Sequence, residues 1–549
     1  MSAQSVNYDL PTGLVRRYAR EVAHLRQLFE TKRMGLVLGA GVSTAANLPN
    51  WNDLIEGVAT ELGKLGLTIA GLETKAVPVQ TQIMFSRFRE QTFNDIDVRE
   101  LSQPYKDAEV AARWRKLVHK ILYSGVDSIE EKIDNHPYLD VLAALAFRIP
   151  LVISYNFDDL LERALARHVA RVRHSHTIGY YAAWGPNFLL QDDRPVVYHP
   201  NGYLPFDLID RYSDNVVLTE EALSDQIIGY GLGEYATLLD YVTTRSCLFI
   251  GFSLNDSAQR TLLRQAVHRA PGNVHYYVQF LDDKTKVTEQ EMADLRETNF
   301  DLFNVVTLFL DSRDCRTLFE LVAISSDDDF DDAFFKAGRP EVYRYYVAGP
   351  VSIGKTSTIS RLQGLTVVDE WLSPKDPLIA KASHELTDEQ RQKVDDWIME
   401  QLRLKNRRFC MANRGIHVMD RAPLDAFAFT SPGEEATKAK MIWERVCGAA
   451  VGRKPSPLAP GCLLFLKGRP DDLAMRQRWR GRSGDADYIA KQQTALEKTY
   501  HGPGVYVLDI SGNSIEVVVR RVTKFIHLNE YSEFDFTGRL QGYLSHELS

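Results

Sequence analysis

The sequence predicts an α/β protein made of two units, each a parallel β-sheet covered by helices. Short apolar runs alternate with longer amphipathic stretches, which is typical of strands buried on both faces and joined by crossover helices. A glycine-rich turn follows the first apolar run of each half, at Gly39 and at Gly349. An acidic run over residues 325–335 interrupts the alternation between the halves.

The first half begins with an amphipathic stretch, residues 14–31, which predicts a helix. The buried strand MGLVLGAG follows, and residues 52–135 are expected to be mostly helical. Further strands are predicted in IPLVISYN, RPVVYH, RSCLFIGFS and NVHYYVQF, with the helix DDLLERALARHVARV after the first of them.

The acidic run marks the expected domain boundary. Charged runs are most simply solvated, so we expect a first domain over 1–325, an acidic linker over 326–340 and a second domain over 341–549. The second domain has predicted strands in VYRYYVAG, LTVVDEW, RFCMANRGIHVMDR, PGCLLFLKG and VYVLDIS.

Composition excludes several classes of protein. A length of 549 residues allows two or three domains, and a net charge of −8 argues against general binding to nucleic acid or anionic membranes. The five cysteines show no CxxC spacing, so no zinc site or disulfide framework is expected. The N-terminus is polar, and no apolar run reaches the ~18 residues of a membrane span. We expect a cytoplasmic protein.

The segment GAGVSTAANLPNW (39–51) lies between a predicted strand and a helix beginning at Trp51. This is the context of a nucleotide-binding turn, in which Gly39 and Gly41 let the backbone approach a pyrophosphate. The glycines alone also fit an ordinary tight turn.

The rest of this segment resembles the first signature of the sirtuin superfamily. Gly39 to Ser43 match its GAG-(I/V)-S string, Leu48 and Pro49 take its Ile-Pro positions, and Trp51 replaces its aromatic residue. Four later segments also resemble sirtuin segments and fall in the order in which the family has them. They are SYNFDD (154–159), YHPNGYLP (198–205), VVLTEEAL (216–223) and FIGFSLND (249–256).

The resemblance implies a Rossmann-like sirtuin fold, with residues 60–135 at the place of the family's small domain, and NAD as substrate. The residues it assigns to NAD binding are Gly39, Ala40, Gly41, Ser43, Pro49, Trp51, Asn201, Gly251 and Ser253.

Three residues are candidates for catalysis. Cleavage of the nicotinamide–ribose bond passes through an oxocarbenium-like state, for which Asn156 can position water or polarise the ribose. Asp158 can hydrogen-bond the ribose or the nicotinamide amide, and His199 can act as a base or hold a ribose hydroxyl. Asn156 also fits a helix N-cap, and His199 a structural histidine.

Departures from the family pattern narrow the expected reaction. The chain lacks the four-cysteine zinc ribbon of deacetylases and the Arg that follows their aromatic residue. Asn201 stands directly before the glycine where the family has His, with His199 two residues earlier, so either residue could fill that role. These departures resemble the sirtuin-like NADases of bacterial anti-phage defence, which hydrolyse NAD to nicotinamide and ADP-ribose.

A second site is predicted at GPVSIGKT (349–356), a complete P-loop between a strand and a helix. Gly349 and Gly354 shape the loop for ATP or another (deoxy)nucleotide. Lys355 neutralises phosphate, and Thr356 ligates Mg²⁺.

The order of motifs after the P-loop resembles the deoxynucleoside kinase and thymidylate kinase family over most of residues 342–528. Glu370 matches the family's carboxylate after the second strand, and Asp420–Arg421 its acidic-Arg pair. Its arginine lid matches a run containing Arg476, Arg478, Arg480 and Arg482. A surface salt bridge and a solvated helix face are the ordinary alternatives for these groups.

An NADase that is always active would poison its own cell, so the second domain is interpreted as its gate. We expect NAD depletion in anti-phage defence, triggered by a nucleotide or nucleoside linked to infection, in a homo-oligomer as in similar NADases. Three alternatives stay open: a protein deacylase, a (deoxy)nucleoside or nucleotide kinase with a regulatory NAD-binding domain, and a non-catalytic sensor that recruits a partner.

Overall fold

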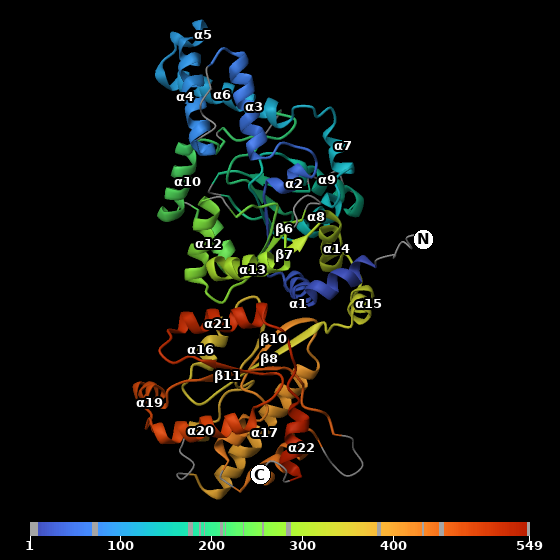
Figure 1. The fold of residues 1–549 in the computed structure, drawn as a ribbon, viewed down its shortest axis with the longest axis vertical. Coiled ribbons are helices and arrows are strands. Elements are labelled where there is room, and N and C mark those ends of the chain that lie inside the picture. The colour runs from blue at the N-terminus through green and yellow to red at the C-terminus, as the bar shows by residue number, and fades with distance from the viewer. Residues whose placement is uncertain are drawn as a thin grey trace. The chain divides into compact units, whose positions relative to one another are not determined.

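A computed structural model describes residues 9–67, 75–173, 179–185, 188–191, 193–208, 212–214, 216–233, 235–254, 257–281, 287–380, 386–430, 433–448 and 455–545. The chain divides into two compact units (Figure 1). The first unit comprises residues 1–18, 28–270 and 274–337, and the second comprises 19–27, 271–273 and 338–549.

The first unit is built on a seven-stranded sheet in the order β3-β4-β2-β1-β5-β6-β7, with every pair of neighbours parallel. Its central strands are buried along their whole length, as expected for a sheet covered on both faces. The strands are β1 (Met34–Leu38), β2 (Leu151–Ser154), β3 (Tyr181–Ala183), β4 (Val196–Tyr198), β5 (Ser246–Ile250), β6 (His275–Phe280) and β7 (Val305–Leu310).

The helices of this part of the chain are α1 (Leu10–Glu30), α2 (Ala40–Thr44), α3 (Trp51–Lys64), α4 (Val77–Asn94), α5 (Ile96–Arg99), α6 (Gln103–Leu122), α7 (Ile129–Asp134), α8 (Leu139–Ala146), α9 (Leu160–Arg173), α10 (Glu220–Leu232), α11 (Ala236–Thr244), α12 (Ser257–Arg269), α13 (Glu289–Phe303), α14 (Ser312–Ala323) and α15 (Asp327–Ala337). Capping residues explain several starts: Asn50 and Asp53 form a capping box before α3, and Thr288 and Asp311 cap α13 and α14.

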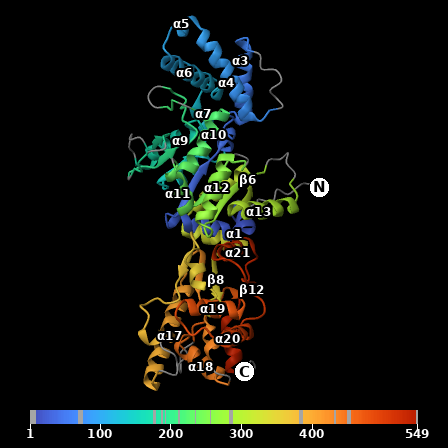
Figure 2. The ribbon, with the colours of Figure 1, turned by 90° about the vertical axis from the view of Figure 1, so that its left-hand side faces the viewer.

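The predicted helical stretch after the first strand consists of α3 to α7, of which α3, α4 and α6 pack together at one end of the first unit (Figures 1 and 2). Their contact is aromatic, with the rings of Phe85 and Phe88 5.2 and 5.4 Å from that of Trp114.

Strand order places a topological switch point between β1 and β5. The chain leaves β1 for β2, β4 and β3 on one side, then returns to pair β5 with β1 on the other. Ligands of open α/β sheets bind at the carboxyl ends of strands at such a point.

The second unit has a five-stranded sheet, again entirely parallel, in the order β12-β11-β8-β10-β9. Its strands are β8 (Val342–Ala348), β9 (Thr366–Val368), β10 (Gly415–Asp420), β11 (Cys462–Lys467) and β12 (Val505–Asp509). Its helices are α16 (Lys355–Ile359), α17 (Asp388–Cys410), α18 (Glu435–Arg445), α19 (Pro470–Trp479), α20 (Ala486–Thr499), α21 (Ile515–Leu528) and α22 (Phe536–Leu544), with 3₁₀ turns at Pro377–Ala380 and Asp425–Phe429.

The prediction of a mixed α/β chain with two parallel sheets is confirmed, and every apolar run singled out contains a strand. The strands β3 and β7 were not predicted. The acidic linker predicted over 326–340 needs correction, because residues 327–337 form α15. Phe330, Ala333 and Phe334 are buried on one face of this helix, while Asp327, Asp328 and Asp329 occupy the first turn, where the helix dipole favours negative charge.

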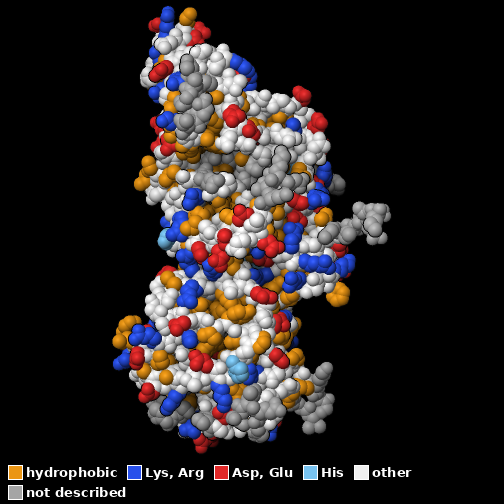
Figure 3. Space-filling model, in the orientation of Figure 1, with side chains coloured by type: hydrophobic (Ala, Val, Ile, Leu, Met, Phe, Trp, Pro, Cys, Tyr) orange, Lys and Arg blue, Asp and Glu red, His pale blue; other side chains and the backbone are white. Residues whose placement is uncertain are grey.

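The surface carries both signs of charge. On the face seen in Figure 3, Lys and Arg lie interspersed with Asp and Glu over both units. Among the described helices, none is long and apolar enough to cross a membrane. Cys247, Cys315, Cys447 and Cys462 are buried and Cys410 is exposed, all with free thiols.

Candidate functional site

The residues predicted to bind NAD lie where four adjacent strands of the first sheet end. Gly39 directly follows β1, Asn156 comes two residues after β2, His199 directly follows β4 and Gly251 directly follows β5. Because β4, β2, β1 and β5 are neighbours and parallel, their carboxyl ends share one edge. The fold therefore gathers segments that are up to 212 residues apart in the numbering of Gly39 and Gly251.

The glycines of this edge are required by close contact between two turns. A Cβ on Gly41 would lie 2.7 Å from the Cα of Gly251, and one on Gly39 would lie 2.6 Å from the Gly251 carbonyl oxygen. Gly251 itself has φ +76°, and its Cβ would lie 2.7 Å from Val42 N. Gly39 has φ −124°, so its turn needs no left-handed backbone. These glycines thus bring the β1 and β5 ends together.

Asn156 presents a buried polar atom without a partner. Its side chain is 8% exposed, and its Oδ1 accepts no hydrogen bond from any described residue. A buried unsatisfied amide oxygen is costly and requires an explanation. An oxygen aimed at a ligand or a reacting water supplies one, which fits the predicted role. The N-cap alternative is not seen, since Asp158 Oδ1 accepts from the Leu160 N–H at the start of α9, at 3.2 Å.

Asp158 joins the glycine turn to the start of α9. Its Oδ2 accepts a hydrogen bond of 2.6 Å from the Ser43 hydroxyl in α2. Burial raises the pKa of Asp158 to about 6, against the two hydrogen bonds that favour its charged form. Two predicted residues, Ser43 and Asp158, are therefore in direct contact.

His199 is completely buried, and both of its ring nitrogens have partners. Nδ1 lies 2.8 Å from the Asn156 carbonyl oxygen, and Nε2 lies 2.6 Å from Glu162 Oε1. Burial alone would lower the pKa of His199, but Glu162, the Asn156 carbonyl and Asp158 together raise this pKa above its ordinary value. His199 therefore contacts the backbone carbonyl of Asn156.

Asn201 is also buried, with its Nδ2 3.3 Å from the Tyr155 carbonyl oxygen. Its Oδ1 accepts a hydrogen bond of 3.2 Å from the Gln226 side chain of α10. Asn201 thus fixes the loop after β4 against the end of β2.

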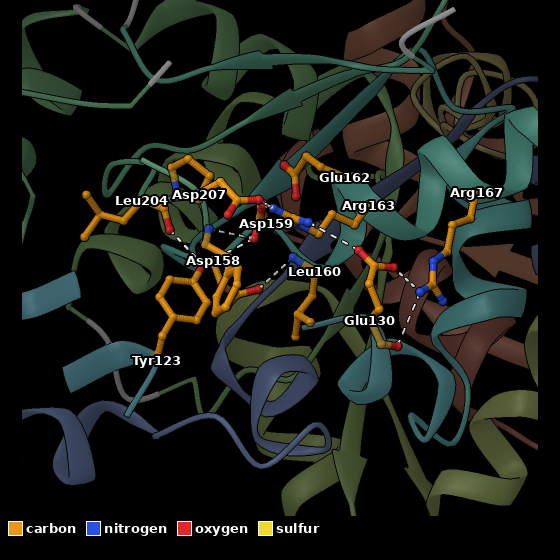
Figure 4. Close-up of polar contacts among 12 residues, drawn as sticks. Tyr123, Glu130, Asp158, Asp159, Leu160, Glu162, Arg163, Arg167, Leu204 and Asp207 are labelled. Atoms are coloured by element: carbon orange, nitrogen blue, oxygen red, sulfur yellow. Dashed lines mark hydrogen bonds and ion pairs between the residues drawn. The ribbon is translucent and has the colours of Figure 1, made fainter. Parts of the chain in front are cut away.

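A polar network around Asp159 and Arg163 holds the start of α9 (Figure 4). Asp159 accepts from the Arg163 Nε at 2.7 Å, from the Phe206 N–H at 3.1 Å and from the Tyr123 hydroxyl at 3.3 Å. Arg163 also pairs with Asp207 at 2.6 Å. The network connects α9, the end of α6 and the loop after β4. Hydrogen bonds to charged groups therefore hold these three segments together.

The remaining predicted NAD-binding residues flank the edge. Trp51 stacks on Phe157, with ring centroids 6.0 Å apart, and Ala40 and Pro49 are half-buried. Asn47, directly before Leu48 in the same segment, has φ +60°, a conformation that Asn tolerates. Ser253 is exposed beyond β5, and residues 255–256 of the fourth matching segment lie outside the described residues.

In the second unit, the segment predicted as a P-loop (349–356) runs from the end of β8 into α16. Gly349 and Gly354 both have positive φ, +147° and +102°, and a Cβ on Gly349 would lie 2.4 Å from the Leu466 carbonyl oxygen. The Lys355 ammonium donates to the carbonyl oxygens of Gly349 (2.7 Å) and Pro350 (3.0 Å). Burial lowers its pKa to about 8.

Carboxylates from neighbouring strand ends face the P-loop. The Thr356 hydroxyl donates to Asp420 Oδ2 at 2.6 Å, while Asp420 Oδ1 is buried with no hydrogen-bond partner in the described part of the chain. Glu370 Oε1 accepts from Arg421 Nε at 2.6 Å, and Arg421 has φ +68°, a strained conformation for a side-chain-bearing residue. The pair is partly buried rather than on the surface.

The residues present fit a magnesium ion. Mg²⁺ is held in P-loop proteins by the loop hydroxyl, one carboxylate and substrate phosphates, and the orphaned oxygen of Asp420 lies beside the Thr356 hydroxyl. Over the described residues, no group of three or more His, Cys, Asp or Glu side chains could hold a metal by itself.

The arginine run predicted as a lid spans the end of a helix and the residues after it. Arg476 and Arg478 lie in the last turn of α19, Arg480 caps that helix and Arg482 follows it. Arg478, Arg480 and Arg482 are exposed.

Several buried polar residues around both sites were not predicted from the sequence. At the first site, the buried residue is Glu162, which contacts His199. Around the second, the Lys405 ammonium of α17 donates to the carbonyl oxygens of Asp420 (2.5 Å) and Glu370 (3.3 Å), clamping two strand ends. Asp425 accepts from the Tyr500 hydroxyl at 2.8 Å. A charged residue on the apolar face of an amphipathic helix was the available signal for Glu162 and Lys405.

Known proteins resemble parts of this chain. No curated protein matches the chain. A solved structure titled "Crystal structure of EHV4-TK complexed with TP4A" covers 38% of this chain and 96% of its own, with 12% sequence identity and a TM-score of 0.25. A likeness at that TM-score supports no conclusion about activity.

A family described as SIR2-like domain matches residues 150–303. The match spans the ends of β2, β4 and β5, with Asn156, Asp158 and His199, and begins after the Gly39–Ser43 turn. Residues 150–303 of this chain are therefore similar to the SIR2-like domain, which implies an NAD-related activity.

Proposed function

We propose that the first unit hydrolyses NAD to nicotinamide and ADP-ribose. The observation that carries the proposal is the buried Oδ1 of Asn156, which has no hydrogen-bond partner among the described residues and lies at the shared edge of β4, β2, β1 and β5. The likeness of residues 150–303 to the SIR2-like domain supports NAD as the substrate.

The chemistry requires few protein groups. The bond between nicotinamide nitrogen and ribose breaks, the positive charge passes from nicotinamide to an oxocarbenium-like ribose, and water adds with release of one proton. Asn156 Oδ1 can accept a hydrogen bond from that water or from a ribose hydroxyl, which orients the attack. The Gly39–Ser43 turn supplies close backbone approach for the pyrophosphate.

We further propose that the second unit binds a nucleotide with Mg²⁺ and gates the NADase in anti-phage defence. Lys355 and the loop backbone would hold phosphates, and Thr356 with Asp420 would hold the ion. A ligand can activate only by binding the active state more tightly than the inactive one. Exposed Arg478, Arg480 and Arg482 are candidates for contact with phosphates once bound.

Phosphoryl transfer by the second unit is a second candidate function. It is favoured by the Glu370–Arg421 pair beside the P-loop, because a carboxylate near an attacking hydroxyl can take its proton. Transfer of a labelled γ-phosphoryl group to a nucleoside or a monophosphate tests it. Absence of transfer with every acceptor, while nucleotides still bind, would leave a binding domain only.

The main test is an assay of NAD consumption by the full chain with a panel of nucleosides and (deoxy)nucleotides, with and without Mg²⁺. We expect one class of nucleotide to raise turnover. Asn156→Ala should abolish turnover, and Lys355→Ala should remove the response to nucleotide. Asn52→Ala and Lys498→Ala, both at exposed positions, are the matched controls. NAD left intact with every nucleotide, and in infected cells, would refute the proposal.

A further inference from the structure

A buried acid–histidine pair lies directly behind Asn156. His199 and Glu162 have exposures of 0% and 1%. The His199 Nε2 lies 2.6 Å from Glu162 Oε1, and its Nδ1 lies 2.8 Å from the carbonyl oxygen of Asn156. The three residues come from the end of β4, from α9 and from the loop after β2.

The partners determine where the protons of this ring are. A carbonyl oxygen only accepts hydrogen bonds, so Nδ1 carries a proton. The second proton lies between Nε2 and the carboxyl of Glu162, as imidazolium with carboxylate or as imidazole with carboxylic acid. In either arrangement no ring lone pair is available to take a proton from water.

We infer that His199 is not the base of NAD hydrolysis but a positioning residue, and that Glu162 and His199 together hold the backbone of Asn156 so that its amide faces the reacting bond. This inference rests on the proposed NADase function. Glu162 is thereby assigned a role in the site, although it contacts neither NAD nor the attacking water.

The surroundings of the pair support a fixed structure. The charged and titratable groups that face His199 are Glu162, Asp158 and Tyr203, whose ring centroid is 4.6 Å from that of His199. Asn201, at the position where the family has histidine, is an amide and cannot act as a base. An oxocarbenium-like ribose is electrophilic enough to accept water whose proton passes to solvent, so the reaction does not require a histidine base.

Substitutions can separate positioning from proton transfer. In Glu162→Gln/His199→Asn, the Asn amide nitrogen replaces Nδ1 as donor to the Asn156 carbonyl, and no buried charge is stranded. The matched variant Glu162→Gln/His199→Ala lacks that donor. We expect kcat/KM for NAD to stay within about tenfold of wild type in the first, and to fall roughly 100-fold, mainly in kcat, in the second.

A histidine base would give a different result. Both double variants would then fall alike, by roughly 100- to 10,000-fold, and the acid limb of the pH–rate profile would vanish in both. That outcome would overturn the inference, as would equal and near-wild-type activity of the two variants, which would leave the pair without any role in positioning.

A measurement independent of activity uses the ring ¹⁵N shifts of His199 in the wild-type protein, assigned through the closeness of its ring to that of Tyr203, 4.6 Å away between centroids. We expect both nitrogens to remain protonated or proton-sharing from about pH 5.5 to 8.5. A freely titrating ring with one bare nitrogen would overturn the inference, even if the variants do not fold. Wild-type protein that consumes no NAD would refute the proposed function, while these shifts still decide the state of the pair.

Discussion

Asn156, Asp158 and His199 have distinct surroundings in the structure, although the sequence predicts them as one catalytic group. Asn156 has a buried oxygen to which no described residue donates, Asp158 binds Ser43 and the start of α9, and both nitrogens of His199 are hydrogen-bonded. The residue types were readable from the motifs. Their partners were not, because Ser43 and Glu162 reach them only after the strands have paired. Direct contact of Asp158 with NAD stays a prediction.

The raised pKa of Asp158 predicts that this residue costs stability. Its folded-state pKa of about 6 lies above the ordinary value, so the folded protein holds the proton more tightly. The cost of ionisation is absent below about pH 4, grows as the pH rises and is complete above about pH 6. Asp158→Asn should therefore stabilise the first unit by about 1 to 2 kcal/mol at pH 7.5, and less at pH 4.5.

Urea unfolding at pH 7.5 and pH 4.5 measures the difference in stability between Asp158→Asn and wild type. The unfolding transition of the first unit is identified as the one that added ADP-ribose shifts. Ser43→Ala is the matched comparison, because it removes a hydrogen bond that favours the charged carboxylate and should destabilise at pH 7.5. A destabilised Asp158→Asn at neutral pH would show that the carboxylate is structural.

The pKa of Lys355 is shifted in the opposite direction from that of Asp158, and this shift leads to a second prediction. Lys355 has a pKa lowered to about 8 by burial, so at pH 9 it is mostly uncharged. A bound triphosphate favours its charged form, and we expect nucleotide binding at pH 9 to take up close to one proton. Calorimetric titration in buffers of different ionisation enthalpy measures this uptake. Lys355→Met should abolish it, whereas Lys498→Met, at an exposed lysine, should retain it.

At the scale of elements, the turns after β1 and β5 depend on each other. Gly39 and Gly41 belong to a motif visible in the sequence, but their contact is with Gly251, more than 200 positions later. Amphipathic helices show a related effect: Glu162 shares the inward face of α9 with buried Leu165 and Val169. A helical pattern predicts which face is buried, and only the partner explains a charge on it.

Gly251→Ala should disrupt this contact. A Cβ there would lie 2.7 Å from the Gly39 carbonyl oxygen and 2.7 Å from Val42 N, at a φ of +76°. We expect the free energy of unfolding to fall by about 2 to 4 kcal/mol. We also expect NAD binding to be lost. The control is Gly231→Ala in α10, where a Cβ meets nothing within 4 Å and stability should change by no more than about 1 kcal/mol. Calorimetry and ADP-ribose titration check both, and equal effects would contradict the contact.

At the scale of the whole molecule, the proposal of a gate has a thermodynamic consequence. Each unit has its own parallel sheet and its own candidate ligand. If a nucleotide at the P-loop raises NAD affinity by some factor, NAD must raise nucleotide affinity by the same factor. We expect about 5- to 150-fold, the usual range of such coupling.

Asn156→Ala allows this coupling to be measured, because it should bind NAD without consuming it. Titrations of each ligand in the presence and absence of the other give the two factors, with Asn156→Ala/Lys355→Ala as the uncoupled control. Two independent affinities would refute gating through binding, and would leave the two units as separate activities.

The sequence by itself determined the two parallel α/β sheets, the strands that carry the glycine turns and the residue types at the strand ends. Periodicity and glycine spacing are local, so they survive without knowledge of the fold. Strands β3 and β7 and helix α15 were not predicted, α15 because its buried phenylalanines lie within an acidic run.

The tertiary structure decided which atoms meet: Gly251 with the β1 turn, Glu162 with His199, Lys405 with two strand ends. The role of a histidine depends on what each of its nitrogens faces, and that is settled only when β2, β4 and α9 come together.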